Sequence, residues 1–317
     1  MADGGGFGSK LGIIKLASWA AGYLAPTALI PFLNETLSVA FDRIPDDSLV
    51  GTASRGPSAQ GGLAVAGETT HNLDYNNFDT LFECLMGTAV GRTFTISDDD
   101  LPKWPSVEID KVISRHRFYS GKIVKATFSC RAGGVAQAKF GWLIRKRDLS
   151  ATAFPAISTP GPRNLVLFKH AISKIWIGDQ ADALAAGDAV GFDSYEITFD
   201  RQMVSDDRDS NSPTEILEPI PGDWRMGEVK LTLPRYNTGT SVLADWKDND
   251  TALQLQIQHV AGAESITMQF PNLRITDGFN VPVEGPGPIT LEGTLQASPS
   301  QAGNPMYVGN EMRVTFT

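Results

Sequence analysis

The 317-residue sequence predicts a mainly β fold built from two repeated units. Apolar and polar residues alternate in many short runs, and 31 Gly and 19 Pro separate these runs, as is typical of strands joined by turns. The second half also repeats the order of predicted elements of the first. We therefore expect two domains, residues 1–160 and 161–317, joined near 151–163, where Ala, Ser, Thr, Gly and Pro predominate.

The repeat begins with a strand in each half. The segments Thr36–Arg43 and Ser194–Arg201 both alternate and both end in Phe-Asp-Arg. A polar stretch rich in turn-forming residues follows each strand and leads to a Gly-Glu pair, Gly67-Glu68 in one half and Gly227-Glu228 in the other. Shared elements in the same order favour a duplication over coincidence.

A helix is predicted next in each half. Apolar residues at helical spacing mark Phe78–Met86, with Asn77 as the expected N-cap and Gly87 after the last turn. The second half continues into a shorter helix, which carries Val242, Leu243 and Trp246. The repeat thus extends from the first strand through the helix.

Each half is predicted to finish with a β-hairpin. In the first half the strand 107–113 is expected to turn back through 119–121 into 123–128. In the second half, residues 265–275 are expected to turn back into 289–295. The amino end is different, because Leu11, Ile14, Leu16 and Trp19 predict a short helix within 8–22.

Two segments resemble the tail tube proteins of long-tailed phages. They are Gly67–Gly87, which reads GETTHNLDYNNFDTLFECLMG, and 118–124, which reads FYSGKIV. The resemblance implies that each half is a β-sandwich or partly rolled barrel with one flanking helix. It further implies stacked rings that form a tube, with one sheet lining the lumen. The implied role is structural, and no catalytic residue or cofactor is expected.

Two long segments without regular pattern, Ile44–Ala66 and Gln202–Met226, follow the first strand of each half. Connections of this length in a compact domain are usually functional or disordered. The resemblance implies that they reach a neighbouring subunit or ring. Their apolar side chains, which need burial, are the expected assembly residues: Leu49, Val50, Leu63, Val65, Ile216, Leu217 and Trp224.

The formal net charge is −9, which argues against tight wrapping of nucleic acid, because such binding requires many Lys and Arg side chains at phosphates. Residues 1–160 carry 16 Lys and Arg against 15 Asp and Glu, whereas residues 161–317 carry 11 against 21. The acidity therefore belongs to the second half. The basic clusters 115–117 and 145–147 are short, and we expect them at a solvated rim or against acidic loops of a neighbour.

The expected partners follow from the resemblance: other copies of this chain, tail terminator, tail tip and tape measure proteins, and phage DNA that passes without specific binding. The expected location is the virion tail, assembled in the host cytoplasm. A chain with two copies can fill six ring positions three at a time, which predicts a homotrimeric ring with pseudo-sixfold symmetry. A nearly neutral half would then always adjoin an acidic one.

The sequence also contains residues that could suggest other kinds of site. Asp207, Asp209, Asn211 and Glu218 match the oxygen spacing of a calcium loop weakly, because Ser212 replaces the glycine that such a loop needs at its sharp turn. The four histidines lack ligand spacing, and no Gly-x-Ser-x-Gly elbow is present. Cys84 and Cys130 are expected to be reduced core residues, and the apolar stretch 11–33 is too interrupted to span a membrane.

Two other functions fit a β-rich tandem protein. A carbohydrate-binding or adhesin module of a virion or cell surface would use an exposed tryptophan and remain a monomer. An enzyme with an unrecognised site would show a polar cleft with perturbed titratable groups.

Overall fold

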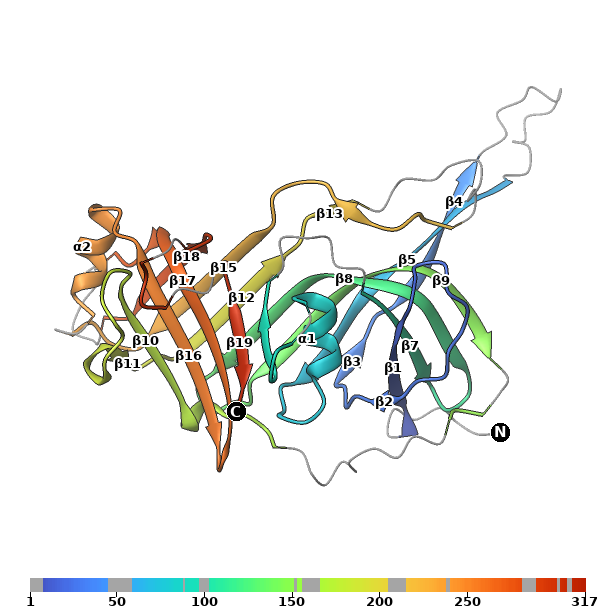
Figure 1. Ribbon diagram of the computed structural model, residues 1–317, viewed down its shortest axis with the longest axis horizontal. Coiled ribbons are helices and arrows are strands. Elements are labelled where there is room, and N and C mark those ends of the chain that lie inside the picture. The colour runs from blue at the N-terminus through green and yellow to red at the C-terminus, as the bar shows by residue number, and fades with distance from the viewer. Residues whose placement is uncertain are drawn as a thin grey trace.

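The computed structural model confirms a mainly β fold in which the strands pair antiparallel (Figure 1). It describes residues 8–44, 59–87, 89–96, 103–150, 153–155, 166–204, 215–237, 240–280, 289–300, 303–306 and 310–317. Two α-helices, α1 (Asp79–Leu85) and α2 (Val242–Asp248), lie within these ranges, one in each half.

The strands of the first half are β1 (Lys10–Leu16), β2 (Ala28–Leu29), β3 (Asn34–Glu35), β4 (Ser38–Ile44), β5 (Ala59–Asn72), β6 (Thr93–Thr95), β7 (Trp104–Asp110), β8 (Arg115–Arg131) and β9 (Gln137–Ser150). Those of the second half are β10 (Ser173–Asp179), β11 (Ala189–Val190), β12 (Ser194–Asp200), β13 (Met203–Val204), β14 (Ile220–Pro221), β15 (Met226–Leu233), β16 (Leu253–Ala261), β17 (Glu264–Gly278), β18 (Leu291–Ala297) and β19 (Arg313–Phe316). Two 3-10 turns, His170–Ile172 and Ala186–Asp188, flank β10.

Strand pairing follows the same order in the two halves. The first half runs β2-β1-β7-β8-β9-β5, with β3 and β4 both paired to β5. The second runs β11-β10-β16-β17-β18-β15-β12. The short β19 pairs with β17 and with β6, so the carboxyl end of the chain joins the two halves.

A second junction makes the two halves one continuous sheet. Strand β12 pairs with β15 on one side and with β8 on the other, from Ser194 opposite Arg131 to Asp200 opposite Lys125. These strands lie side by side in the middle of Figure 1. The halves therefore share a backbone-paired seam rather than a flexible connection.

Helix α1 packs its apolar side on β8. Leu81, Phe82 and Leu85 are buried, as the helical spacing predicts, and the Phe82 ring stacks on Phe128 of β8 with ring centroids 5.4 Å apart. The expected N-cap is wrong by one residue. Phe78 occupies the N-cap position, and the Asn77 side chain is directed back to the Asp74 carboxylate.

Two expectations for the first half are also wrong. The segment expected as a helix within 8–22 is strand β1, whose residues pair along the whole of β7. Residues 119–121 are not a turn but the middle of β8, and the hairpin turns instead between Asp110 and Arg115. In both cases pairing with a neighbouring strand outweighs the local apolar spacing.

The predicted long segments are partly strands. β5 already begins at Ala59 and pairs with β4, so this hairpin continues past the body of the sheet as an arm (Figure 1). In the second half β13 pairs with β14 in a separate two-stranded sheet near the same side. We call the two hairpins the β4–β5 arm and the β13–β14 arm.

Two buried histidines couple the fold to pH. His71 of β5 contacts Phe78 and Phe140, and burial lowers its pKa to about 4 despite a hydrogen bond to the Pro31 carbonyl. Burial, with a smaller contribution from the charge of His170, also lowers the pKa of His259 to about 4. The unfolded chain therefore binds these protons at a higher pH than the folded chain does.

We expect the unassembled protein to lose stability as the pH falls from about 6.5 toward 4, by about 2 kcal/mol per histidine at pH 5 relative to pH 7. Urea unfolding at the two pH values measures this loss. Replacing His71 with leucine should reduce the pH-dependent loss by about half, whatever the variant costs at pH 7. An unchanged difference between the two pH values would show that His71 does not titrate on unfolding.

Candidate functional site

One face of the continuous sheet is polar across both halves. On β5, β9, β8, β12 and β15, alternate residues on this face are at least partly exposed, and they include Glu68, Thr70, Lys139, Lys125, Thr127, Ser129, Glu196, Thr198, Lys230 and Thr232. The residues between them, such as Phe128, Ile197 and Val229, are buried in the core. The period-2 pattern thus separates a polar face from the core.

Opposite charges meet on this polar face. Lys139 lies 2.7 Å from Glu68, and Lys125 of β8 lies 3.9 Å from Asp200 of β12, across the junction of the halves. On β15, Lys230 pairs with Glu228 at 3.0 Å. The described part of the face therefore presents balanced charge instead of a basic groove.

The polar face is hollowed where the halves meet. A hollow of about 960 Å³ is lined by residues of β8, β9, β12 and β15, among them Ser129, Gln137, Glu196 and Lys230. A smaller hollow of about 300 Å³ adjoins it, lined by Glu68, Lys125, Lys139 and Thr198 among others. Both linings mix polar and apolar groups, unlike the mostly apolar pockets that bind small molecules.

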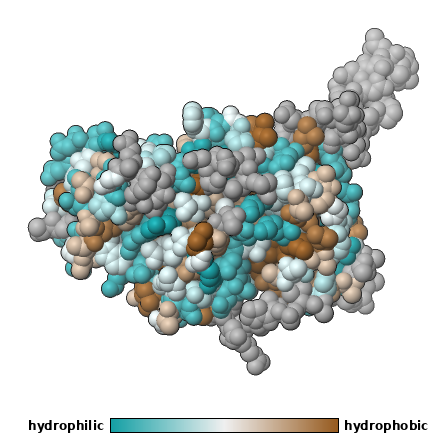
Figure 2. Space-filling view, in the orientation of Figure 1, coloured by the Kyte–Doolittle hydropathy of each residue, from teal (hydrophilic) through white to brown (hydrophobic). Residues whose placement is uncertain are grey.

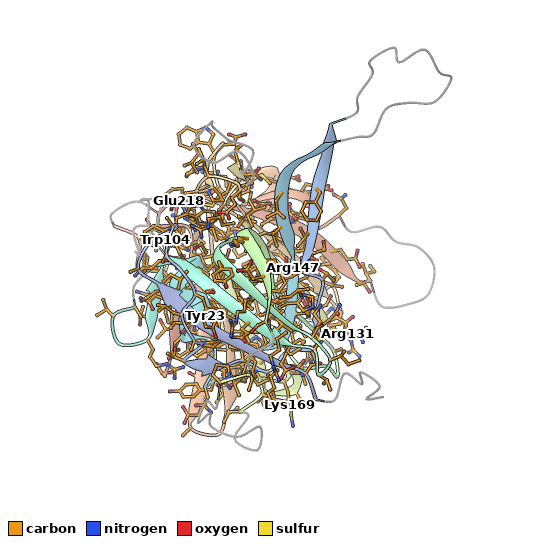
Figure 3. All side chains as sticks on the ribbon, turned by 90° about the vertical axis from the view of Figure 1, so that its right-hand side faces the viewer. Tyr23, Trp104, Arg131, Arg147, Lys169 and Glu218 are labelled. Carbon is orange, nitrogen blue, oxygen red and sulfur yellow. The ribbon has the colours of Figure 1, made fainter. Side chains whose placement is uncertain are left out.

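A short segment of the second half is locked into the first half. We call residues 215–219 the latch. The ammonium of Lys122, whose side chain is 1% exposed, lies 2.8 Å from the Glu218 carboxylate and donates to the Pro219 carbonyl. Trp104 donates its Nε1–H to Glu218 at 2.6 Å, and Figure 3 shows these two residues side by side.

The other end of the latch is held as firmly. Ile216 is buried, and its carbonyl accepts a hydrogen bond from the indole of Trp19. The Arg145 guanidinium lies 3.3 Å from Glu215 and also donates to the Trp19 carbonyl. The latch thus fixes the start of the β13–β14 arm's return strand against the first half.

Beyond the latch, the β13–β14 arm and the start of β15 expose apolar side chains. Trp224 is 89% exposed, and Val204, Ile220 and Met226 are exposed as well. Phe41 is exposed on the β4–β5 arm. Exposed aromatic and aliphatic groups gathered on projecting elements are typical of protein contact surfaces.

The predicted assembly residues fall into three groups. Leu49 and Val50 lie outside the described residues. Leu63 and Val65 belong to β5, and Val65 is buried in the core, so it presents no surface. Ile216 is buried in the latch, Leu217 is partly exposed, and Trp224 is fully accessible.

The candidate calcium loop lies mostly outside the described part of the chain and stays a prediction. Asp207, Asp209 and Asn211 lie outside the described residues, and Glu218 already binds Lys122 and Trp104. In the described part of the chain, no three His, Cys, Asp or Glu side chains gather closely enough to hold a metal ion. Cys84 and Cys130 are free and buried, and burial raises the pKa of their thiols to about 12 and about 11.

The basic clusters are engaged within the chain. Arg117 lies 3.4 Å from the buried Glu108, and its guanidinium stacks 3.8 Å from the centre of the Tyr23 ring. Tyr23 in turn donates to Glu108 at 2.6 Å, and burial, with a smaller contribution from this bond, raises the pKa of Tyr23 to about 12. Together with the Arg145–Glu215 pair, these contacts place one arginine of each cluster in intrachain packing.

The two halves differ in surface character. In Figure 2, hydrophobic side chains gather over the first half on the right, whereas the second half on the left is mostly hydrophilic. No helix within the described ranges is long and apolar enough to cross a membrane.

The alternating polar residues that form the sheet face were visible in the sequence, but the strand order that brings them together was not.

Comparison with known families identifies the class. The family model for phage tail tube proteins matches residues 6–297, which is nearly the whole chain. The chain therefore belongs to the phage tail tube protein family, a structural family of the virion tail. No curated protein matches the chain significantly.

Proposed function

We propose that this chain polymerises as stacked rings into the phage tail tube and forms the conduit for DNA ejection into the host. The observation that carries this proposal is the polar sheet face, which crosses both halves without a break through the β8·β12 junction. An unbroken hydrophilic surface backed by a core suits the wall of a water-filled channel.

The charges of this face suit a wall past which DNA slides. DNA binds where Lys and Arg neutralise phosphates and release counterions. Here Lys125, Lys139 and Lys230 each lie beside a carboxylate of the same face. Each of these lysine charges is therefore already balanced by a carboxylate, so DNA phosphates gain little by binding to this face.

We also propose that the chain is a duplicated tail tube subunit, divided near residue 160, and that three chains close one ring with pseudo-sixfold symmetry. The matching strand orders of the halves support the duplication. The paired β8·β12 junction supports the ring, because it already joins two successive units side by side.

Contacts along the tube are assigned to the arms. The β13–β14 arm and the adjoining residues carry Trp224, Val204 and Ile220 to the outside of the body, where the next ring would cover them. Tail terminator, tail tip and tape measure proteins would meet the ends and lumen of the tube. Assembly in the host cytoplasm and a role without catalysis complete the proposal.

Electron microscopy of the purified protein tests this function. We expect tubes or rings whose end-on views show a strong sixfold signal at the lumen and threefold symmetry at larger radius, because the two halves differ in charge and in their arms. Exact sixfold symmetry at every radius would contradict the ring of three. Monodisperse monomers at high concentration would contradict assembly itself and favour a binding module.

A further inference from the structure

The seam inside the chain leaves two matching sheet edges without a described partner. Strand β12 is paired on both sides, whereas β3 and β4 pair with β5 alone among the described strands. In β17, residues 264–273 pair with β16, but residues 274–278 have β18 on one side and no described strand on the other. An edge that is not bonded to a neighbouring strand is a template for another strand, although at the β17 edge the Gly278 carbonyl accepts a hydrogen bond from Lys247 of α2.

The β3–β4 edge occupies the position in the first half that β12 occupies in the second. Asp200 lies opposite Met226, the residue before the Gly-Glu pair of the second half. Ser38 lies opposite Ala66, the residue before the Gly-Glu pair of the first half. The register of the sheet therefore makes Ser38 the structural equivalent of Asp200. The shared Phe-Asp-Arg endings predict a different equivalent, Asp42.

The β17 edge likewise matches the part of β8 that receives β12. Lys125 lies opposite Gly141, which lies opposite the glutamate of the first Gly-Glu pair. Arg274 lies opposite Gln296, which lies opposite the glutamate of the second pair. The three residues of each set lie side by side on neighbouring strands, in the order β8-β9-β5 in the first half and β17-β18-β15 in the second. Arg274 therefore holds the position of Lys125.

We propose that residues 35–38 of one chain pair antiparallel with residues 274–278 of the next chain, with Ser38 opposite Arg274, as Asp200 pairs with Lys125 within the chain, and with Thr276 as the extra residue of the β17 bulge. This seam rests on the proposed ring and specifies its contact. Each chain carries one edge of each kind, so the contact is head to tail, the kind that closes a ring when the rotations between chains add up to a full turn. The partner is a second copy of this chain.

Side-chain character is compatible with this register. Phe199 opposite Ala126 forms the core side of the internal seam. The corresponding pair between chains is Leu37 opposite Ile275, and both are apolar and packed against the core. Ser38 and Arg274 would then fall on the polar face, which continues unbroken into the next chain.

At each of the two edges, a backbone amide donates a hydrogen bond to a nearby carboxylate. The Leu37 amide donates to the Glu35 carboxylate at 3.1 Å, and the Gly278 amide donates to the Asp277 carboxylate at 2.7 Å. Each donor is thus satisfied by an acidic side chain of its own strand rather than by a neighbouring strand. Edge carboxylates also discourage indiscriminate pairing before the correct edge arrives.

Cysteine cross-linking tests the register. Within the chain the Arg201 amide bonds to the Val124 carbonyl, so the adjacent pair, Asp200 and Lys125, is a non-hydrogen-bonded pair, the closely spaced kind. The variant Ser38→Cys with Arg274→Cys should therefore form a disulfide between chains on mild oxidation. Non-reducing gels of oxidised tubes should show a ladder that ends at three linked chains.

Two matched variants make the result decisive. Lys125→Cys with Asp200→Cys should form a disulfide within one chain, which shows that the geometry permits the bond. Ala40→Cys with Arg274→Cys moves one cysteine two residues along the edge, to a diagonal Cα distance of about 7–8 Å, and should cross-link far less.

The outcomes separate the seam from the ring. Tubes that form while the Ser38–Arg274 variant stays unlinked and the intrachain variant links would overturn the seam and leave the proposed function standing. Stronger linking by the displaced Ala40 variant would overturn the register. Absence of any oligomer in the unmodified protein would overturn the proposed function, and the seam with it.

Discussion

Replacing Phe82 with alanine is expected to lower the free energy of unfolding by about 3–5 kcal/mol, the usual cost of removing a fully buried aromatic ring. Phe82 is the centre of an aromatic cluster. Its ring stacks on Phe128 and meets Phe94 and Phe316 at centroid distances of 5.6 and 5.4 Å. Phe316 belongs to β19, so the cavity would also loosen the carboxyl-terminal strand that joins the halves.

Urea unfolding of the unassembled protein, followed by circular dichroism, measures this loss. Phe41→Ala is the matched control, because Phe41 is exposed on the β4–β5 arm and its removal should cost under about 1 kcal/mol. A loss under about 1 kcal/mol for Phe82→Ala would contradict a core role for α1 and point to an interface role instead.

Replacing Glu218 with glutamine is expected to cost about 3 kcal/mol, the lower end of the range for breaking a buried ion pair by removing one partner. The change leaves the Lys122 ammonium buried with the Pro219 carbonyl but without the carboxylate. The lower end applies because the Glu218 side chain is 33% exposed, so water can reach it.

Removing the other partner of the ion pair, Lys122, distinguishes the cost of an unpaired buried charge from a general loss of packing. Lys122→Met removes the buried charge and keeps similar volume, so it should cost less than Glu218→Gln does. Combining the two changes should cost less than their sum, which a double-mutant cycle measures. Glu228→Gln, which removes a partner of the exposed Lys230, is the matched surface control and should cost under about 1 kcal/mol.

Release of the latch should also be visible locally. Hydrogen exchange of residues 215–221 should accelerate in Glu218→Gln more than exchange in β8 does, because the latch is held by side chains while β8 is held by strands on both sides. Uniform acceleration throughout the chain would mean that the latch and the sheet unfold together.

The sequence alone determined the elements that depend on local pattern. Alternation along Ser194–Asp200 and helical spacing around Phe82 predicted a strand and a helix that the structure contains. The order of elements and the segment Gly67–Gly87 also led to the family that the comparison established. Local spacing suffices here because it records which side of an element is buried.

The same pattern failed where a distant segment decided the outcome. Residues 10–16 are apolar enough for a helix, but they form a strand because β7 lies alongside them. Lys122 gave no signal as a buried residue, because its partner Glu218 lies far along the chain. A one-dimensional pattern does not specify the partners of a polar group or of a strand edge.

The tertiary structure therefore decided how the predicted elements combine. Alternation on β8 and β12 indicated a polar and an apolar face for each strand, but only their pairing merged these faces into one surface across both halves. The same pairing showed which edges have no neighbouring strand among the described residues. Backbone hydrogen bonds between strands are alike for every sequence, so the choice of neighbour depends on long-range packing rather than on local residues.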